Sequence, residues 1–244
     1  MRTYAIGDIH GHLELLHRAH ARIAADQARQ GPGTTVHVGD LVDRGPDSRG
    51  VIEHLRSGIA AGQDWVVLKG NHDRMFAGFL RDVRYREPGL REDLSYLHYK
   101  IGGGTTLGSY GVANAADRPI APVHAEAAAA VPQAHRNFLE ACPVLFRRDG
   151  AVFVHAGIRP GVPLDSQAET DLLWIRGGFL DDRRDHGALI VHGHTALDRG
   201  TLYPNRLNLD SGAAYGGPLS AVVIDDGAVF LLTEAGRLQL HPEV

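Results

Sequence analysis

The sequence predicts an α/β sandwich, and two observations support this prediction. In the first eighty residues, short apolar and β-branched runs alternate with helix-like stretches, which is the pattern of βαβ units in a mainly parallel sheet. From Pro143 onward, short strand-like runs dominate, and two pairs of them are joined by Asp-Gly, a dipeptide typical of tight hairpins. The chain therefore divides into a parallel first half and a second, more antiparallel layer.

Three strand–helix pairs follow one another at the start of the chain. Apolar residues at helical spacing, such as Leu16, Ala19 and Ile23, indicate the first helix. Gly-polar dipeptides begin at Gly7, Gly39 and Gly70, about thirty residues apart, which is roughly the length of one βαβ unit. The strands are expected at 3–6, 34–38 and 65–68, and the helices at 12–29, 47–59 and 72–81.

Residues 82–142 have a different pattern. Three arginines are interleaved with four acidic residues over 82–93, which indicates a solvent-exposed helical face. Three glycines at 102–104 predict a turn that borders the substrate cleft. No linker-like composition bounds this stretch, so we expect one domain over 1–244 with a helical insertion at about 82–142. One helix is expected at 124–131, and a second helical piece follows it and ends at Ala141. The later strands are expected at 144–147, 151–154, 189–191, 206–209, 219–224 and 229–233.

Composition excludes several classes of protein. The 244 residues carry a formal net charge of −4, whereas chains that cover nucleic acid have a basic excess. The one cysteine, Cys142, excludes an internal disulfide framework and a cysteine-rich zinc site. No apolar run approaches the roughly 18 residues of a membrane helix, and Asp8 stands where a signal peptide would be apolar. We expect a cytoplasmic protein with no nucleic-acid or membrane partner. The sequence does not predict the oligomeric state.

Polar side chains follow five of the expected strands, at the edge where ligand sites form in parallel α/β units. Asp8 and His10 are two residues apart, so an extended backbone points both the same way. His192 and His194 alternate at another strand end, and we expect only His194 to face the site. The other strand ends carry Asp40, Asn71 and His155. This set of oxygen and imidazole ligands suits Mn²⁺, Fe²⁺ or Zn²⁺ and is large enough for two ions.

Phosphoryl transfer at two ions also needs a proton donor and cationic side chains. His72, Arg44 and Arg176 are the candidates. Several of these candidate residues also have a simpler interpretation: Asp8 could cap a helix, Asn71 could occupy a turn, and Arg176 could form a surface ion pair. The joint occurrence of all five motifs favours the site. The other histidines, including His12, His17, His20, His54 and His135, are expected at solvent-exposed helix positions.

The motifs GDIHG (7–11), GDLVDRGP (39–46), GNHD (70–73), HAG (155–157) and GHT (193–195) resemble the calcineurin-like metallophosphoesterases. Among these they are most similar to the bacterial and phage-type serine/threonine protein phosphatases of the PPP family. The resemblance extends over most of the chain. It implies a metallophosphoesterase-type β-sandwich of two mixed sheets flanked by helices, with two divalent metal ions, Mn²⁺ first and Fe or Zn as alternatives.

The resemblance also implies a role for each matching residue. In the assignment that we adopt, the first ion is bound by Asp8, His10 and Asp40, and the second by Asp40, Asn71, His155 and His194. An alternative allots His194 to the first ion. His72 would protonate the leaving group, with Asp43 holding its ring. Arg44 and Arg176 would bind phosphate.

The activity implied is hydrolysis of phosphate monoesters by metal-activated hydroxide, with a phosphorylated protein or a small phosphoester as substrate. The alternative is a diadenosine tetraphosphatase-like dinucleoside polyphosphate hydrolase. A catalytically silent scaffold that binds metal or senses phosphate is disfavoured, because His72, Asp43 and every ligand are present. Two departures from the eukaryotic phosphatases, Asp73 in place of Glu and the absence of a convincing counterpart to their C-terminal tyrosine, bear on protein-substrate specificity. Tyr215 is a poor candidate for that tyrosine.

Overall fold

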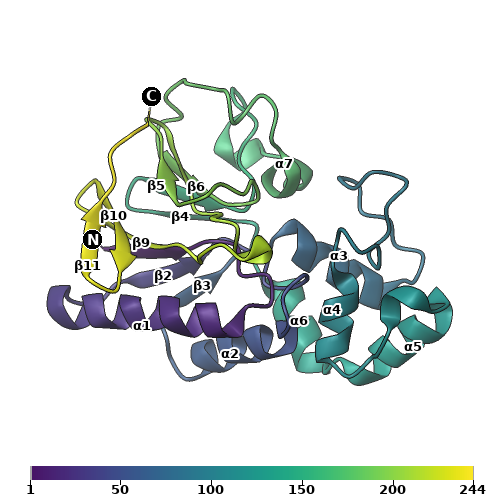
Figure 1. The fold of residues 1–244 in the computed structure, drawn as a ribbon. Coiled ribbons are helices and arrows are strands. Elements are labelled where there is room, and N and C mark those ends of the chain that lie inside the picture. Colours follow the sequence, from purple (N-terminus) through teal and green to yellow (C-terminus); the bar gives the residue numbers. More distant parts are fainter. Residues whose placement is uncertain (1, 244) are drawn as a thin grey trace.

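The computed structural model describes residues 2–243, which form two mixed β-sheets packed face to face with helices outside them (Figure 1). The first sheet consists, in spatial order, of β11 (Gly236–Gln239), β10 (Ala228–Thr233), β9 (Ala221–Asp225), β1 (Thr3–Ile6), β2 (Thr34–His37) and β3 (Trp65–Val67). The second consists of β4 (Leu145–Arg148), β5 (Ala151–Val154), β6 (Leu189–His192), β8 (Arg206–Asn208) and β7 (Thr201–Leu202). The predicted fold class is confirmed.

The helices are α1 (Leu13–Gln30), α2 (Ser48–Ala60), α3 (Asn71–Arg81), α4 (Gly103–Ser109), α5 (Ile120–Ala130), α6 (Gln133–Ala141) and α7 (Glu169–Trp174). Figure 1 shows α1 and α2 along the outer face of the first sheet and α7 beyond the second sheet. Helices α4, α5 and α6 gather at one end of the sandwich (Figure 1). Among residues 2–243, no helix has both the length and the apolar character needed to span a bilayer.

The strand pairing confirms that the strands of the first half are parallel. It corrects the prediction that the second half forms a separate, more antiparallel layer. Strands β1, β2 and β3 are parallel neighbours, as the βαβ pattern predicts. Both Asp-Gly hairpins form, with positive φ at Asp149 (50°) and Asp226 (47°). However, β9 and β10 do not join a separate antiparallel layer, because β9 pairs with the free edge of β1. The second sheet is itself mixed, since β5, β6 and β8 run parallel.

Three apolar layers follow from the alternation of side chains along the strands. Ile6 packs toward α1 and α2, whereas its neighbour Ala5 faces the second sheet. Phe153 of β5 packs against the first sheet, and the flanking Val152 and Val154 pack against the α7 side. The strands of both sheets are therefore covered on two faces, which leaves their ends as the place where polar groups gather.

The 82–142 segment differs from its prediction in two places. No helix forms between residues 82 and 102. The charged stretch is irregular, and Glu87 is buried among hydrogen-bond donors instead of facing solvent. The glycines at 102–104 cap and begin helix α4, so the expected turn at these residues does not form. They permit close packing, since a Cβ on Gly102 would lie 2.5 Å from the Arg44 backbone nitrogen.

A histidine cluster lies under α1 and α2, where exposed positions were expected for His20 and His54. His37 Nδ1 donates to the Val66 carbonyl oxygen (3.3 Å), which makes His37 Nε2 an acceptor in the neutral ring. His20 therefore donates from Nε2 to His37 Nε2 (2.9 Å) and accepts at Nδ1 from His54 Nε2 (2.9 Å). Trp65 stacks on the His20 ring with centroids 4.3 Å apart. His135 is also buried, between Tyr110 and Glu53.

Candidate active site

The six predicted metal ligands lie together at one edge of the sandwich. Those from the first sheet follow β1 and β2 or begin α3, and those from the second sheet follow β5 and β6. Each is at most 7% exposed. The two sheets contribute to one place because their parallel strands end at the same edge. The six residues are Asp8, His10, Asp40, Asn71, His155 and His194.

Four of these residues converge closely. His155 Nε2 lies 2.8 Å from Asn71 Oδ1 and 3.3 Å from Asp40 Oδ1. His194 Nδ1 lies 2.9 Å from the same Asn71 oxygen. The ligand atoms of Asp40, His155 and His194 are all within 4.8 Å of one another. This grouping matches the set that we expected for the second ion.

The hydrogen bonds of His155 test whether a cation fits there. Its Nδ1 donates to the Val38 carbonyl oxygen (3.0 Å), so the neutral ring carries a lone pair on Nε2. That lone pair faces the oxygens of Asn71 and Asp40, so three acceptors meet without a proton between them. Burial outweighs the nearby Asp40 carboxylate and lowers the pKa of His155, so a proton does not fill the position at neutral pH. A divalent cation satisfies such a set of acceptors.

The other side of Asp40 also fits a cation. His10 Nδ1 donates to the Val42 carbonyl oxygen (3.0 Å), and its Nε2 lies 3.4 Å from Asp40 Oδ2. Asp8 Oδ2 accepts from the His194 backbone N–H (2.9 Å), whereas Asp8 Oδ1 has no hydrogen-bond partner among residues 2–243. Burial and the nearby carboxylates of Asp210 and Asp40 raise the pKa of Asp8. A bound cation would stabilise the ionised form of this buried carboxyl, and Asp40 lies between the two groups.

The backbone is strained where these side chains turn inward. Eight non-glycine residues of the described chain have positive φ, and five of them belong to the site. Bulky residues rarely adopt this region, and such strain is concentrated at functional sites. The five are His10 (45°), Asp40 (51°), Asp43 (73°), Arg44 (70°) and His194 (67°).

His72 and Asp43 form a hydrogen-bonded pair beside the acceptor cluster. His72 Nδ1 donates to Asp43 Oδ2 (2.7 Å), so its Nε2 faces the pocket and accepts from the Arg44 guanidinium (3.1 Å). Arg44 also donates to His10 Nε2 (3.0 Å). Arg176 donates to the His194 carbonyl oxygen (3.2 Å) from the rim. The structure thus brings together all ten residues that the sequence singled out.

A cavity of about 260 Å³ opens over these groups. Seven of its lining residues were not predicted as site residues, among them Trp174, Asp210 and Tyr215. Asp210 follows β8 almost directly, so the strand-end signal that found Asp40 could also have found Asp210. Tyr215 was a poor candidate from the sequence, but it lies at the rim of the cavity, and the centre of its ring is 5.3 Å from Arg44 Cζ. His192 does not line the cavity; it contacts Arg206 instead (3.3 Å).

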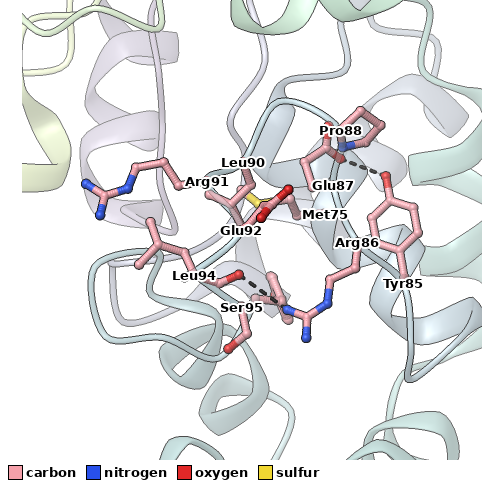
Figure 2. A pocket seen from close by; sticks show the side chains of 11 residues that line it. Met75, Tyr85, Arg86, Glu87, Pro88, Leu90, Arg91, Glu92, Leu94 and Ser95 are labelled. Carbon is pink, nitrogen blue, oxygen red and sulfur yellow. Dashed lines mark hydrogen bonds between the residues drawn. The ribbon is translucent and has the colours of Figure 1, made fainter.

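A second cavity, of about 470 Å³, adjoins the first and shares Leu90 with it (Figure 2). Figure 2 shows the Tyr85 hydroxyl directed at the buried carboxylate of Glu87, a bond of 2.7 Å. Glu87 also accepts from Arg74 and from the Trp174 indole N–H (2.8 Å). Because Trp174 lines the first cavity, this carboxylate connects the 82–142 segment to the site wall.

The sequence of this chain is similar to those of known phosphoesterases. Residues 1–219 match the family model described as calcineurin-like phosphoesterase. A serine/threonine-protein phosphatase 1 from Salmonella typhimurium is 28% identical over 227 residues, which cover 89% of each chain. A symmetrical bis(5'-nucleosyl)-tetraphosphatase from Pseudomonas fluorescens is 40% identical over 83 residues, which cover 34% of this chain and 27% of that protein.

Solved structures share the fold. A putative diadenosine tetraphosphatase superposes with a TM-score of 0.63 at 23% identity, covering 98% of this chain and 94% of that one. A cold-active protein-tyrosine phosphatase from a Shewanella species also gives 0.63, at 17% identity, covering 98% of this chain and 80% of that one.

Proposed function

The chain belongs to the calcineurin-like phosphoesterase family, and within that family we propose that it is a serine/threonine protein phosphatase dependent on two divalent cations. The observation that carries the proposal is the meeting of unprotonated acceptors on both sides of Asp40, next to the His72–Asp43 pair. The family uses a dimetal centre. We propose Mn²⁺ as the first choice for both positions, since the mixed oxygen and imidazole set suits it.

Each residue has a defined task in this proposal. Asp8, His10 and Asp40 hold one ion, and Asp40, Asn71, His155 and His194 hold the other. When bound, the ions supply a polarised water molecule and offset the negative charge on the phosphoryl oxygens. Arg44 and Arg176 bind the remaining phosphate oxygens, for which the forked guanidinium is suited.

His72 acts as the proton donor to the leaving oxygen. Its Nδ1 is committed to Asp43, so the proton transferred would be one that solvent delivers to Nε2, the nitrogen that faces the cavity, once Arg44 no longer donates to it. Substrate phosphate would take over the guanidinium of Arg44 and thereby free His72 Nε2 for the leaving group.

The match to the Salmonella phosphatase supports a protein substrate, because it covers 89% of this chain and of that protein. A second candidate is hydrolysis of dinucleoside polyphosphates. It is favoured by the higher identity to the Pseudomonas tetraphosphatase, although that match covers only 34% of this chain. The two relatives are named for different substrates, a phosphoprotein and a dinucleoside tetraphosphate.

The test is a substrate panel on protein that has been chelated and then reloaded with Mn²⁺. We expect hydrolysis of a phosphoserine peptide to exceed that of diadenosine tetraphosphate, and chelation to abolish both activities. Faster cleavage of the dinucleotide would select the second candidate. Absence of stoichiometric metal by elemental analysis, after loading with Mn²⁺, Fe²⁺ or Zn²⁺, would refute the dimetal assignment.

The role of His72 is tested by His72→Asn. We expect kcat on the phosphoserine peptide to fall by about 100-fold or more, the usual contribution of a positioned proton donor. The metal content should remain at the wild-type level, because His72 is not one of the proposed ligands. Unchanged kcat in this variant would contradict the proposed role.

A further inference from the structure

Two hydroxyl groups of the 82–142 segment bind the carboxylate that holds His72. Tyr96 Oη donates to Asp43 Oδ1 (2.9 Å), and Thr106 Oγ1 donates to the same oxygen (2.7 Å). The other oxygen, Asp43 Oδ2, accepts from His72 Nδ1 (2.7 Å). We propose that Tyr96 and Thr106 are positioning residues for the proton donor, and that this is one task of the 82–142 segment. The inference rests on the proposed function.

The hydrogen bonds of Thr106 fix both the backbone and the side chain of Asp43. The single proton of Thr106 Oγ1 is donated to Asp43 Oδ1, and its lone pairs accept from the Asp43 backbone N–H (2.8 Å). Since that proton is used, the Ser48 hydroxyl is the donor in its 3.0 Å contact with Thr106. Tyr96, Thr106 and Ser48 therefore enclose Asp43, which is 0% exposed.

The strained backbone beside Asp43 makes such support necessary. Asp43 and Arg44 have φ of 73° and 70°, a region that non-glycine residues leave unless the surroundings hold them there. The 82–142 segment supplies this restraint at both residues, because the Arg44 N–H donates to the Gly102 carbonyl oxygen (3.4 Å). The same segment thus restrains the backbone turn and the carboxylate within it.

Orientation of the carboxylate matters because it orients the imidazole. A ring held through Nδ1 presents Nε2 in one direction, and a displacement of about 1 Å from the productive geometry can cost about 100-fold in rate. Without its two donors, Asp43 Oδ1 would be a buried and unsatisfied charged atom, and the carboxylate would turn to find other partners. His72 would turn with it.

The loss of rate caused by a misplaced His72 depends on the leaving group of the substrate. Serine alkoxide leaves only with a proton, whereas 4-nitrophenolate is stable enough to leave without one. A fault in proton delivery therefore slows hydrolysis of a phosphoserine peptide far more than hydrolysis of 4-nitrophenyl phosphate. A fault in metal binding or in folding slows both equally.

The experiment compares Thr106→Val and Tyr96→Phe, which remove one hydroxyl each at nearly constant shape, with Thr106→Ser, which restores it. The matched control is Tyr110→Phe, since Tyr110 is a buried tyrosine of the same segment whose hydroxyl bonds His135 (2.8 Å) instead. We expect kcat on the phosphoserine peptide to fall about tenfold or more in the first two variants, with KM unchanged. On 4-nitrophenyl phosphate the fall should be less than about threefold. Thr106→Ser and Tyr110→Phe should match the wild type.

An independent readout is the pair of ring ¹⁵N chemical shifts of His72 in the protein without substrate, assigned by comparison with His72→Asn. These shifts should move in Thr106→Val and Tyr96→Phe and stay in place in Thr106→Ser and Tyr110→Phe. Unmoved shifts in both hydroxyl-deleted variants, or equal losses on the two substrates, would overturn the proposal. If the wild type hydrolyses no phosphomonoester, the proposed function fails, and the nuclear magnetic resonance shifts still decide whether these hydroxyls orient His72.

Discussion

Gly193 shows how little room a single residue has at the site. It directly precedes the proposed ligand His194, and its N–H donates to the His155 carbonyl oxygen (2.8 Å). A Cβ on Gly193 would lie 1.8 Å from Asp8 Oδ1, far inside van der Waals contact. The residue is glycine here because the carboxylate of Asp8 occupies the space that a side chain would need.

We therefore expect Gly193→Ala to displace Asp8 and to lower the bound metal from about two ions to about one per chain. Elemental analysis after Mn²⁺ loading measures this. Gly108→Ala is the control, because no atom lies within 4 Å of its Cβ position. In helix α4 it should raise the free energy of unfolding by about 0.5–1 kcal/mol and leave the metal content unchanged. Full metal loading of Gly193→Ala would contradict the assignment of Asp8.

At the scale of elements, the irregular stretch that contains Glu87 is stabilised by one buried carboxylate. Each oxygen of Glu87 accepts two hydrogen bonds. Oε1 accepts from Arg74 and Trp174, and Oε2 accepts from Arg74 and Tyr85. We expect Glu87→Gln to lower the free energy of unfolding by about 2–3 kcal/mol, because the amide nitrogen would face donors. Urea unfolding measures this, and the exposed Glu92→Gln should change it by less than about 0.5 kcal/mol. A loss in Glu87→Gln no larger than in Glu92→Gln would rule out this role.

Local sequence patterns predicted some elements of the fold and missed others. Strands β1, β2 and β5 and helices α1 to α3 were predictable, because apolar periodicity and Gly-polar dipeptides act over neighbouring residues. The strand-end residues followed from that pattern, and their motifs predicted which of them meet. The burial of Glu87 was not predictable, since its partners Arg74 and Trp174 lie 13 and 87 residues away, outside the reach of a local pattern. The short α7 and the edge strands β7 and β11 were missed because a few residues carry too weak a pattern.

At the scale of the whole molecule, the chain of His37, His20 and His54 joins β2, α1 and α2 through neutral rings. Burial, with a smaller contribution from neighbouring histidines, lowers the pKa of His20 to about 2 and that of His37 to about 4. In the unfolded chain both should titrate near the ordinary value of about 6.5. The unfolded state thus binds more protons below that pH. The stability that these groups contribute is complete above pH 6.5 and is lost as the pH falls from about 6.5 toward 4.

We predict that His20→Gln reduces the slope of unfolding free energy against pH by up to about 1.4 kcal/mol per unit between pH 5 and 6. Chemical denaturation at several pH values provides the slope. His241→Gln, at an exposed position, should leave it as in the wild type. A slope in His20→Gln equal to that of the wild type would mean that His20 is charged in the folded protein.

The pairing of β9 with β1 joins residues such as Thr3 and Ile224, which are separated by almost the entire chain. During synthesis, β1 leaves the ribosome long before β9 and must wait for it before its second edge is hydrogen-bonded. Until then that edge is open to other chains, and contacts of such long range form slowly. A nascent chain halted before Ala221 therefore cannot complete the sheet after whose strands Asp8 and Asp40 lie, so these two proposed ligands are supported by a complete sheet only after β9 has been made.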